Sequence, residues 1–195
     1  QKATVQEFPF VKAIKHVAGY SHELPEQRDN TFLAKPQNYT FDYGPSLQQN
    51  EMMHVPEVHD LGLDGSGVIV GMLDTGYDYK FHEAFADMNV IAEYDFIYND
   101  DVTQNETDDN DASSQHNHGT YTLSALGGFK AGQLIGPAFG ASFLLAKTED
   151  VRSETQVEED YWVAGIEWLE RMGVDLVSSS LGYNDWYSYD NMDGK

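Results

Sequence analysis

The chain has 195 residues, with 11 Lys and Arg against 33 Asp and Glu, and a formal net charge of −22. Such an acidic chain binds phosphate backbones and anionic lipids poorly, so we expect no nucleic acid and no membrane among its partners. Hydrophobic residues make up 41% of the sequence, which is enough for one core. The absence of Cys excludes disulfides, thiolate zinc sites and a cysteine nucleophile.

Charge is unevenly distributed along the chain. Residues 1–36 carry five basic and four acidic residues, whereas the remaining 159 carry six and 29. Two turn-rich stretches, 25–30 and 36–38, mark the change. We therefore predict a separate N-terminal piece over residues 1–42, with a half-buried strand at 8–17, and one domain over residues 43–195. We expect both ends to be cuts in a longer chain.

Strands and helices alternate after this boundary. The expected strands are runs of apolar and β-branched residues at 68–73, 90–96, 141–147 and 174–181. All but the weaker second strand are continuous enough to be buried on both faces of a sheet. Helical spacing predicts a short helix at 118–126 and a longer one at 155–173, which Thr155 and Glu158 would cap. This order predicts an α/β fold with a mostly parallel sheet covered by helices.

Two residues at the ends of these elements are candidates for chemistry. Reactive groups gather at the carboxyl ends of parallel strands, and Asp74 ends the most apolar strand. His118 opens the short helix, where its ring can be aimed rather than buried. Each residue alone has a plain structural reading, as a turn or cap for Asp74 and as a structural or solvated ring for His118. The combination of Asp74, His118 and a later strand that ends Ser-Leu-Gly, in this order, is a more specific signal of a functional site than either residue alone.

At these residues the sequence resembles the subtilisin-like serine proteases, the subtilases. The matching stretches are residues 67–76 for the aspartate motif, 118–120 with 123–128 for the histidine motif, 136–147 for a strand that lines the substrate cleft, 165–168, and 180–182. The resemblance implies part of a subtilisin-like three-layer α/β domain. It implies a serine endopeptidase in which Asp74 is the triad carboxylate and His118 the general acid and base. The backbone of Ser180, Leu181 and Gly182 would bind an extended peptide or protein substrate.

The sequence departs from the family in one major respect. No Gly-Thr-Ser-Met-Ala nucleophile motif and no oxyanion Asn segment follows Gly182. We therefore expect the serine to lie beyond the end of this chain, which alone would be incomplete and inactive without the remaining part of the catalytic domain. Smaller departures are Tyr121, where many relatives have His, and His116, a second ionisable neighbour or an exposed loop residue. The alternative is a non-catalytic peptide-binding module that has lost its serine.

Partners and location follow from the same resemblance. Residues 10–17 resemble the end of the family's inhibitory propeptide. The resemblance therefore implies that residues 1–42 are an N-terminal extension or propeptide remnant, and it makes the chain's own propeptide an expected partner. An ordinary arm packed on the domain is an equal alternative. We expect a secreted, cell-surface or periplasmic protein. The sequons at Asn38 and Asn105 matter only if the host glycosylates secreted proteins.

No cofactor is expected to be required, although calcium could bind as a structural ion. One acidic loop holds Asp100, Asp101, Glu106, Asp108, Asp109 and Asp111. Calcium takes carboxylate and carbonyl oxygens, but no EF-hand spacing is present, so the metal ligands stay unknown and a solvated loop is the plainer reading. A calcium-responsive extracellular module is a third functional reading. A second acidic cluster, at residues 149–160, could favour basic substrate side chains or complement a helix dipole.

Overall fold

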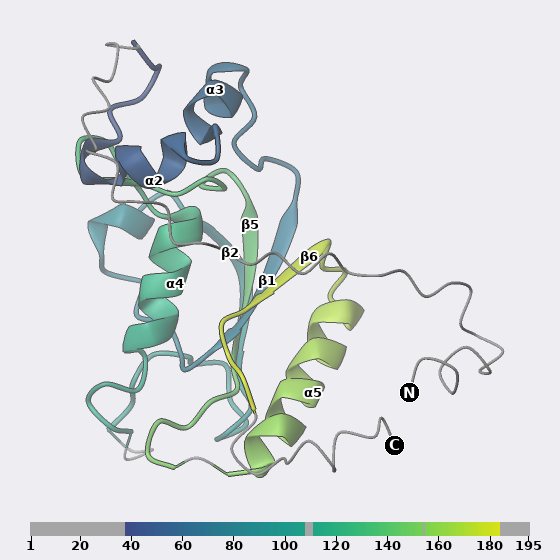
Figure 1. Ribbon diagram of the computed structural model, residues 1–195. Coiled ribbons are helices and arrows are strands. Elements are labelled where there is room, and N and C mark those ends of the chain that lie inside the picture. Colours follow the sequence, from purple (N-terminus) through teal and green to yellow (C-terminus); the bar gives the residue numbers. More distant parts are fainter. Residues whose placement is uncertain (1–37, 108–110, 154, 184–195) are drawn as a thin grey trace, which may run out of the picture. The chain divides into compact units, whose positions relative to one another are not determined.

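The computed structural model describes residues 38–107, 111–153 and 155–183 (Figure 1). In chain order its elements are η1 (Gly44–Ser46), α2 (Leu47–Glu51), α3 (Val55–Asp60), β1 (Ile69–Asp74), η2 (Glu83–Phe85), β2 (Asn89–Asp95), α4 (Asn117–Gly127), β3 (Phe129–Lys130), β4 (Leu134–Ile135), β5 (Ser142–Lys147), α5 (Val157–Arg171) and β6 (Leu176–Ser179). The strand predicted at residues 8–17 lies outside the described residues, so the boundary between residues 42 and 43 stays a prediction.

A parallel sheet of four strands forms the centre of the domain. The strand order is β2-β5-β1-β6, and every neighbouring pair runs parallel. Figure 1 shows α4 on one side of this sheet and α5 on the other. Each parallel connection needs a crossover, which these segments provide. The predicted α/β fold with a sheet covered on both faces is therefore confirmed.

The core has two layers because alternate strand residues point to opposite faces. On the α4 side, the buried cluster contains Val70, Met72, Tyr77, Phe85, Leu123, Ala141, Phe143 and Leu145. On the α5 side, the buried cluster contains Leu73, Leu144, Ala146 and Leu169. Even-numbered residues of β1 therefore face α4, and odd-numbered residues face α5. This alternation decides on which face the last residue of β1 presents its side chain.

Two glycines allow α5 to pack closely on β1. A Cβ at Gly71 would lie 2.7 Å from Cδ1 of Leu169, and a Cβ at Gly165 would lie 2.6 Å from Cδ2 of Leu73. Real Cβ atoms do not approach that closely, so a larger residue at either position would push the helix from the sheet.

The strand predicted at 174–181 differs from expectation. It is shortened to β6, and Leu176 is 55% exposed and Val177 37% exposed. Within the described residues β6 pairs with β1 alone, at one edge of the sheet. The prediction that this strand is buried on both faces is wrong, because an apolar run does not reveal whether a neighbour lies on each side.

The start of α5 also differs in detail from the predicted capping box. The helix begins at Val157, and its N-cap, Gln156, makes no side-chain capping bond. One half of the box is present, since the backbone N–H of Thr155 donates to Oε2 of Glu158 at 3.3 Å. The helix ends at Arg171, and Gly173 follows in the left-handed conformation (φ +81°) that favours glycine.

An aromatic cluster joins the segment before β1 to the loop after β4. The ring of His59 is buried, with Nδ1 2.5 Å from the hydroxyl of Tyr43 and Nε2 3.0 Å from the carbonyl of Pro137. Phe41 meets Phe139 edge to face, with ring centroids 5.5 Å apart. These contacts tie α3 and the segment before η1 to the rest of the domain.

Candidate active site

Three neighbouring strands end in charged residues at one edge of the sheet. In the parallel register, Lys147 of β5 lies beside Asp74 of β1 and beside Asp95 of β2. All three side chains are buried. Asp74 follows Met72 by two residues and therefore points to the α4 face of the sheet. The helix that carries His118 covers this same face.

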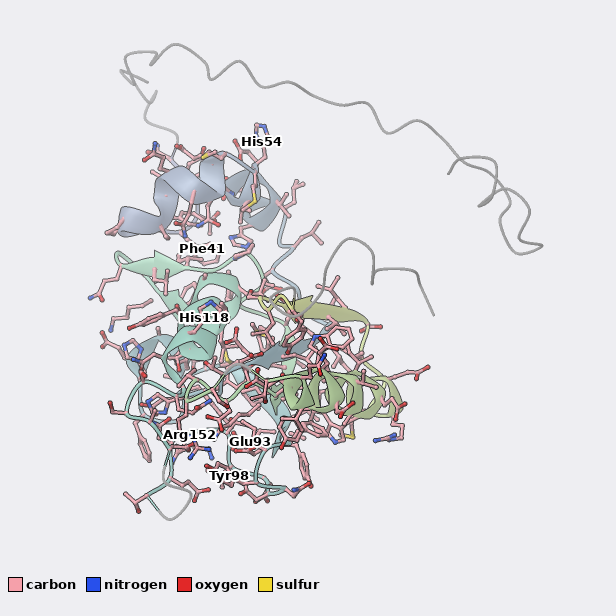
Figure 2. All side chains as sticks on the ribbon, turned by 60° about the horizontal axis from the view of Figure 1, so that its bottom comes forward. Phe41, His54, Glu93, Tyr98, His118 and Arg152 are labelled. Carbon is pink, nitrogen blue, oxygen red and sulfur yellow. The ribbon has the colours of Figure 1, made fainter. Side chains whose placement is uncertain are left out.

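Asp74 and His118 meet at this edge, although they are 44 residues apart in sequence. Nδ1 of His118 lies 2.7 Å from Oδ1 of Asp74. The same oxygen accepts the backbone N–H of Thr75 at 2.7 Å, and Oδ2 accepts the hydroxyl of Thr122 at 3.0 Å. The Asp74 carboxylate is 1% exposed and the His118 side chain is 52% exposed, so a buried carboxylate supports an imidazole that solvent can reach. Figure 2 labels His118 among the side chains of the domain.

This geometry defines the proton chemistry of the imidazole. An ionised carboxylate only accepts hydrogen bonds, so Nδ1 of His118 must donate. In the neutral ring the lone pair then lies on Nε2, which can take a proton from a neighbouring group. Burial and the charge of Asp74 raise the pKa of the nearby Tyr77 hydroxyl well above its usual value, so Tyr77 stays neutral beside the pair.

Two glycines bring the strand end and the helix start together. Gly76 has φ +121°, which L side chains rarely adopt, and it turns the chain directly after Thr75. A Cβ at Gly119 would collide with the carbonyl oxygen of Gly76 and lie 3.1 Å from Cβ of Asp74. The backbone N–H of Gly119 donates to the hydroxyl of Thr75 at 3.1 Å.

A buried glutamine fastens the loop before α4 to the same edge. Nε2 of Gln115 donates to the carbonyl of Thr75 at 2.7 Å and to the carbonyl of Glu149 at 2.5 Å. Its Oε1 accepts the N–H of Val151 at 3.1 Å. Sequence reasoning missed Gln115 because its partners come from distant segments. Its side chain satisfies backbone groups that would otherwise be buried without partners.

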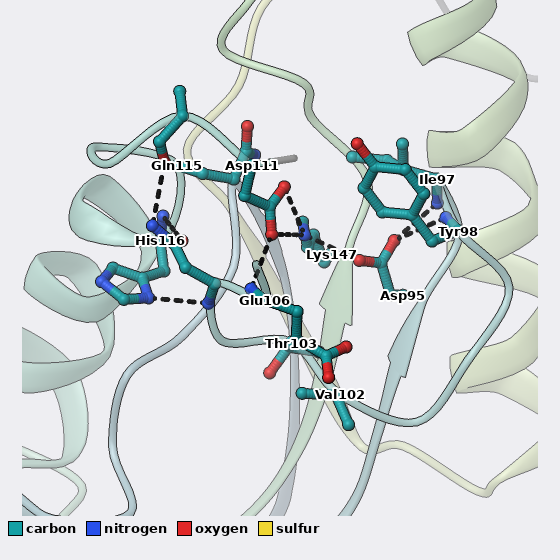
Figure 3. Close-up of polar contacts among 12 residues, drawn as sticks. Asp95, Ile97, Tyr98, Val102, Thr103, Glu106, Asp111, Gln115, His116 and Lys147 are labelled. Carbon is teal, nitrogen blue, oxygen red and sulfur yellow. Dashed lines mark hydrogen bonds and ion pairs between the residues drawn. The ribbon is translucent and has the colours of Figure 1, made fainter. Parts of the chain in front are cut away.

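A fully buried ion-pair cluster, drawn in Figure 3, surrounds Lys147, which is the register partner of Asp74. Nζ of Lys147 lies 2.7 Å from Oδ2 of Asp95 and 3.0 Å from Oδ2 of Asp111. Burial raises the pKa of Asp95, and the hydrogen bond from Lys147 opposes this only in part. Burial lowers the pKa of Lys147, but the two carboxylates raise it more. Sequence analysis did not single out Lys147 or Asp95.

The first acidic cluster is therefore not a uniform solvated loop. Asp111 is an ion-pair partner of Lys147, and Asp100 accepts the N–H of Val102 at 2.9 Å. Asp108 and Asp109 lie outside the described residues. Where side chains are described, no group of three or more His, Asp or Glu residues could hold a metal ion. Structural calcium stays a prediction.

The predicted substrate-binding residues Ser180, Leu181 and Gly182 follow β6. They lie near the end of β1, because Ser179 is the register partner of Leu73. Ser180 and Gly182 are exposed, whereas Leu181 packs against the core on the α5 side. The three residues share the sheet edge with Asp74, and no hydrogen bond joins them to it in the described structure.

Tyr183, which follows Gly182, and His116, which precedes His118 by two residues, have defined hydrogen-bond partners. The hydroxyl of Tyr183 donates to Oε2 of Glu149 at 2.9 Å, and sequence reasoning missed this contact within the second acidic cluster. Nδ1 of His116 accepts the N–H of Asn105 at 2.9 Å. His116 is thus a structural residue rather than an exposed loop histidine. Tyr121 is 67% exposed.

The described residues contain no helix that combines the length and the apolar character needed to span a bilayer.

The chain is similar in sequence to known proteases. The chain is 27% identical over 135 residues to neuroendocrine convertase 2 from Bos taurus, covering 68% of the chain and 20% of that protein. It is 26% identical over 196 residues to the minor extracellular protease Vpr from Bacillus subtilis (strain 168), covering 95% of the chain and 23% of Vpr. The chain thus spans about a fifth of the length of these relatives.

A solved structure and a family model add to these matches. The CspB protease from Clostridium perfringens superposes with a TM-score of 0.52 and 23% identity over 71% of this chain and 34% of that one, which supports the fold. The model of the subtilase family matches residues 65–194. This match covers most of the sequence, including the strand that carries Asp74 and the helix that carries His118. The chain belongs to the subtilase family.

Proposed function

We propose that this chain carries two members of the catalytic triad of a subtilisin-type serine endopeptidase, with Asp74 as the carboxylate and His118 as the general acid and base. The serine would come from residues outside these 195. One observation carries the proposal: a buried carboxylate lies 2.7 Å from Nδ1 of a half-exposed imidazole, at the carboxyl edge of a parallel sheet. Membership of a peptidase family supports it.

In the proposed mechanism, Nε2 of His118 takes the proton from the serine hydroxyl as the oxygen attacks the peptide carbonyl. Asp74 holds the Nδ1–H tautomer and stabilises the imidazolium that forms. His118 then gives this proton to the leaving amine. In the second half of the reaction the imidazole takes a proton from water as the water oxygen attacks the acyl-enzyme. It then gives this proton to the serine oxygen, which leaves as the acid product is released.

We propose a peptide or protein substrate that binds in extended form beside Ser180, Leu181 and Gly182. The exposure of Ser180 and Gly182 leaves their backbone accessible at the sheet edge. An extended peptide can add to such an edge by main-chain hydrogen bonds. An extracellular location is proposed on the printed name of one relative, the minor extracellular protease Vpr.

The proposal is tested on the complete natural protein that contains this chain. A fluorophosphonate probe, which forms a phosphorus–oxygen bond with an activated serine and expels fluoride, should label the wild-type protein. His118→Ala should lose both this labelling and the cleavage of an unfolded protein substrate, because no base remains to take the serine proton. His54→Ala is the matched control, since the His54 side chain is 81% exposed and its Nδ1 lies 3.7 Å from Oε1 of Glu57, away from the Asp74–His118 pair.

Two results would contradict the proposal. The first is cleavage by folded His118→Ala at the wild-type rate. The second is a wild-type protein that binds peptides but neither cleaves them nor reacts with the probe. The second result would favour the non-catalytic peptide-binding module.

A further inference from the structure

The Asp74 carboxylate accepts a hydrogen bond from a residue that the family motifs do not single out. Thr122 lies on α4, four residues after His118 and thus one helical turn away. Its hydroxyl is 3.0 Å from Oδ2 of Asp74, whereas Thr75 and His118 both donate to Oδ1. In the described part of the chain, Thr122 therefore donates to Oδ2, the carboxylate oxygen to which neither Thr75 nor His118 donates.

The single hydroxyl hydrogen of Thr122 has two acceptors within reach. One is Oδ2 of Asp74 at 3.0 Å and the other is the carbonyl of Gly119, also at 3.0 Å. Hydrogen bonds to ionised acceptors are roughly twice as strong as those to neutral acceptors. The carboxylate is also buried, which strengthens a hydrogen bond to it. The Thr122 hydroxyl therefore donates its hydrogen bond to Oδ2 of Asp74 rather than to the carbonyl of Gly119.

We propose that Thr122 is a positioning residue for the Asp74–His118 pair, whose hydroxyl holds Oδ2 so that Oδ1 faces the imidazole and draws negative charge away from Oδ1. The inference rests on the proposed function, because the pair must act as acid and base for its tuning to matter. It adds a third side chain to the two on this chain that the proposed function uses.

The sign of the effect follows from the charges. A donor to the ionised carboxylate stabilises it and makes it a weaker acceptor towards the imidazole. Without the Thr122 hydroxyl, the carboxylate attracts the imidazolium more strongly, and His118 keeps its second proton to higher pH. Less of the neutral base is then available near pH 7. Asp74→Asn acts in the opposite direction because it removes the charge.

Other ionisable groups around the pair remain in place in a Thr122 variant. Tyr77 packs beside Asp74 and stays neutral, because burial raises the pKa of its hydroxyl. Lys147 is held by its two carboxylate partners on the neighbouring strand and loop. Nε2 of His116 lies 4.0 Å from Oδ2 of Asp78. Because none of these groups hydrogen-bonds to Thr122, a shift in the titration of His118 reports on the lost hydroxyl.

The experiment follows the imidazole of His118 by ¹⁵N NMR against pH in the complete protein that contains this chain. Thr122→Val keeps the side-chain shape and should raise the titration midpoint by roughly half a unit to one unit. Thr122→Ser keeps the hydroxyl and should restore the wild-type midpoint. Thr120→Val is the matched control on the same helix, because the Thr120 hydroxyl bonds to the carbonyl of His116 and not to Asp74.

The outcomes separate this inference from the proposed function. Asp74→Asn should lower the midpoint; if it does not, the pair itself fails and the proposed function with it. If Asp74→Asn lowers the midpoint but folded Thr122→Val leaves it unmoved or lowers it, the inference is overturned and the proposed function stands. If Thr122→Val does not fold, Thr122→Ala removes the same hydroxyl, and the same two results apply.

Discussion

Two groups of paired ionisable side chains lie side by side at the carboxyl edge of the sheet, and they differ in access to solvent. Asp74 pairs with an imidazole that is 52% exposed, whereas Lys147 pairs with two carboxylates that are at most 2% exposed. The two strand-end residues are direct register partners. An exposed partner can exchange protons with a substrate, and a buried one can only hold structure. The exposure of the side chains, more than the presence of ionisable groups, distinguishes the Asp74–His118 pair from the buried cluster around Lys147.

The largest predicted effect comes from breaking the buried group. Lys147→Met leaves two carboxylates buried without their cation, and removing one partner of a buried pair costs about 3–5 kcal/mol. Urea unfolding measures this loss. Lys130→Met is the matched control, because Lys130 pairs with Glu83 at an exposed site and should lose at most about 1 kcal/mol. If both variants lost the same free energy of unfolding, the buried Lys147 cluster would stabilise the fold no more than an exposed ion pair does.

Gly119→Ala should disturb the Asp74–His118 pair by moving the backbone at the start of α4. The added Cβ would collide with the carbonyl of Gly76, so the start of α4 must move away from β1. Overpacking of this kind costs about 1–3 kcal/mol, and it should also lengthen the Asp74–His118 hydrogen bond. Gly182→Ala is the control, since a Cβ there meets nothing within 4 Å. A Gly119→Ala variant as stable as Gly182→Ala would show that the close approach is not required.

A pH effect should appear far from this edge, at Tyr43. Burial, followed by the charges of Asp60 and Glu57, raises the pKa of Tyr43 to about 12. An unfolded tyrosine titrates near 10, so the folded state keeps its proton to higher pH than the unfolded state. This contribution to the free energy of unfolding is complete below pH 10 and is lost as the pH rises towards 12.

Tyr43→Phe should therefore flatten the decline of stability above pH 10, as measured by urea unfolding at pH 9, 10 and 11. Tyr121→Phe changes an exposed ring and serves as the comparison. A slope that is the same in both variants would mean that Tyr43 does not differ between the folded and unfolded states.

The smallest effect is expected at the edge strand. The indole N–H of Trp162 donates to the hydroxyl of Ser179 at 2.9 Å, in an exposed environment. Ser179→Ala should cost about 0.5–1 kcal/mol, because water can replace part of the lost bond. A loss of several kcal/mol, measured by the same unfolding assay, would indicate that β6 is more tightly integrated than its exposure suggests.

Much of the fold was predictable because its signals are local. The strands β1 and β5 are continuous apolar runs, and α4 and α5 show helical spacing and terminal glycines, so their bounds match the predictions to within about two residues. The exposure of β6 was not predictable, because an apolar sequence carries no information about a missing neighbour. Half of the capping box at Thr155 was likewise replaced by a later helix start.

The candidate site was predictable only where motifs mark it. Asp74 and His118 belong to recognisable stretches, and the structure brings them together. Thr122 and Gln115 lie outside these stretches, and Lys147 ends one of them without being marked as an ion-pair residue. Each contacts a residue at least 36 positions away, and a single sequence does not reveal these pairings.

The most direct test of the central claim is the rate of peptide hydrolysis by the complete protein with Asp74→Asn in place. The substitution keeps the shape of the side chain but removes the charge that fixes the imidazole tautomer. The account predicts a loss of about 10⁴-fold in kcat with an unchanged melting temperature. Hydrolysis at the wild-type rate by the folded variant would contradict the role of Asp74 and, with it, the assignment of the pair.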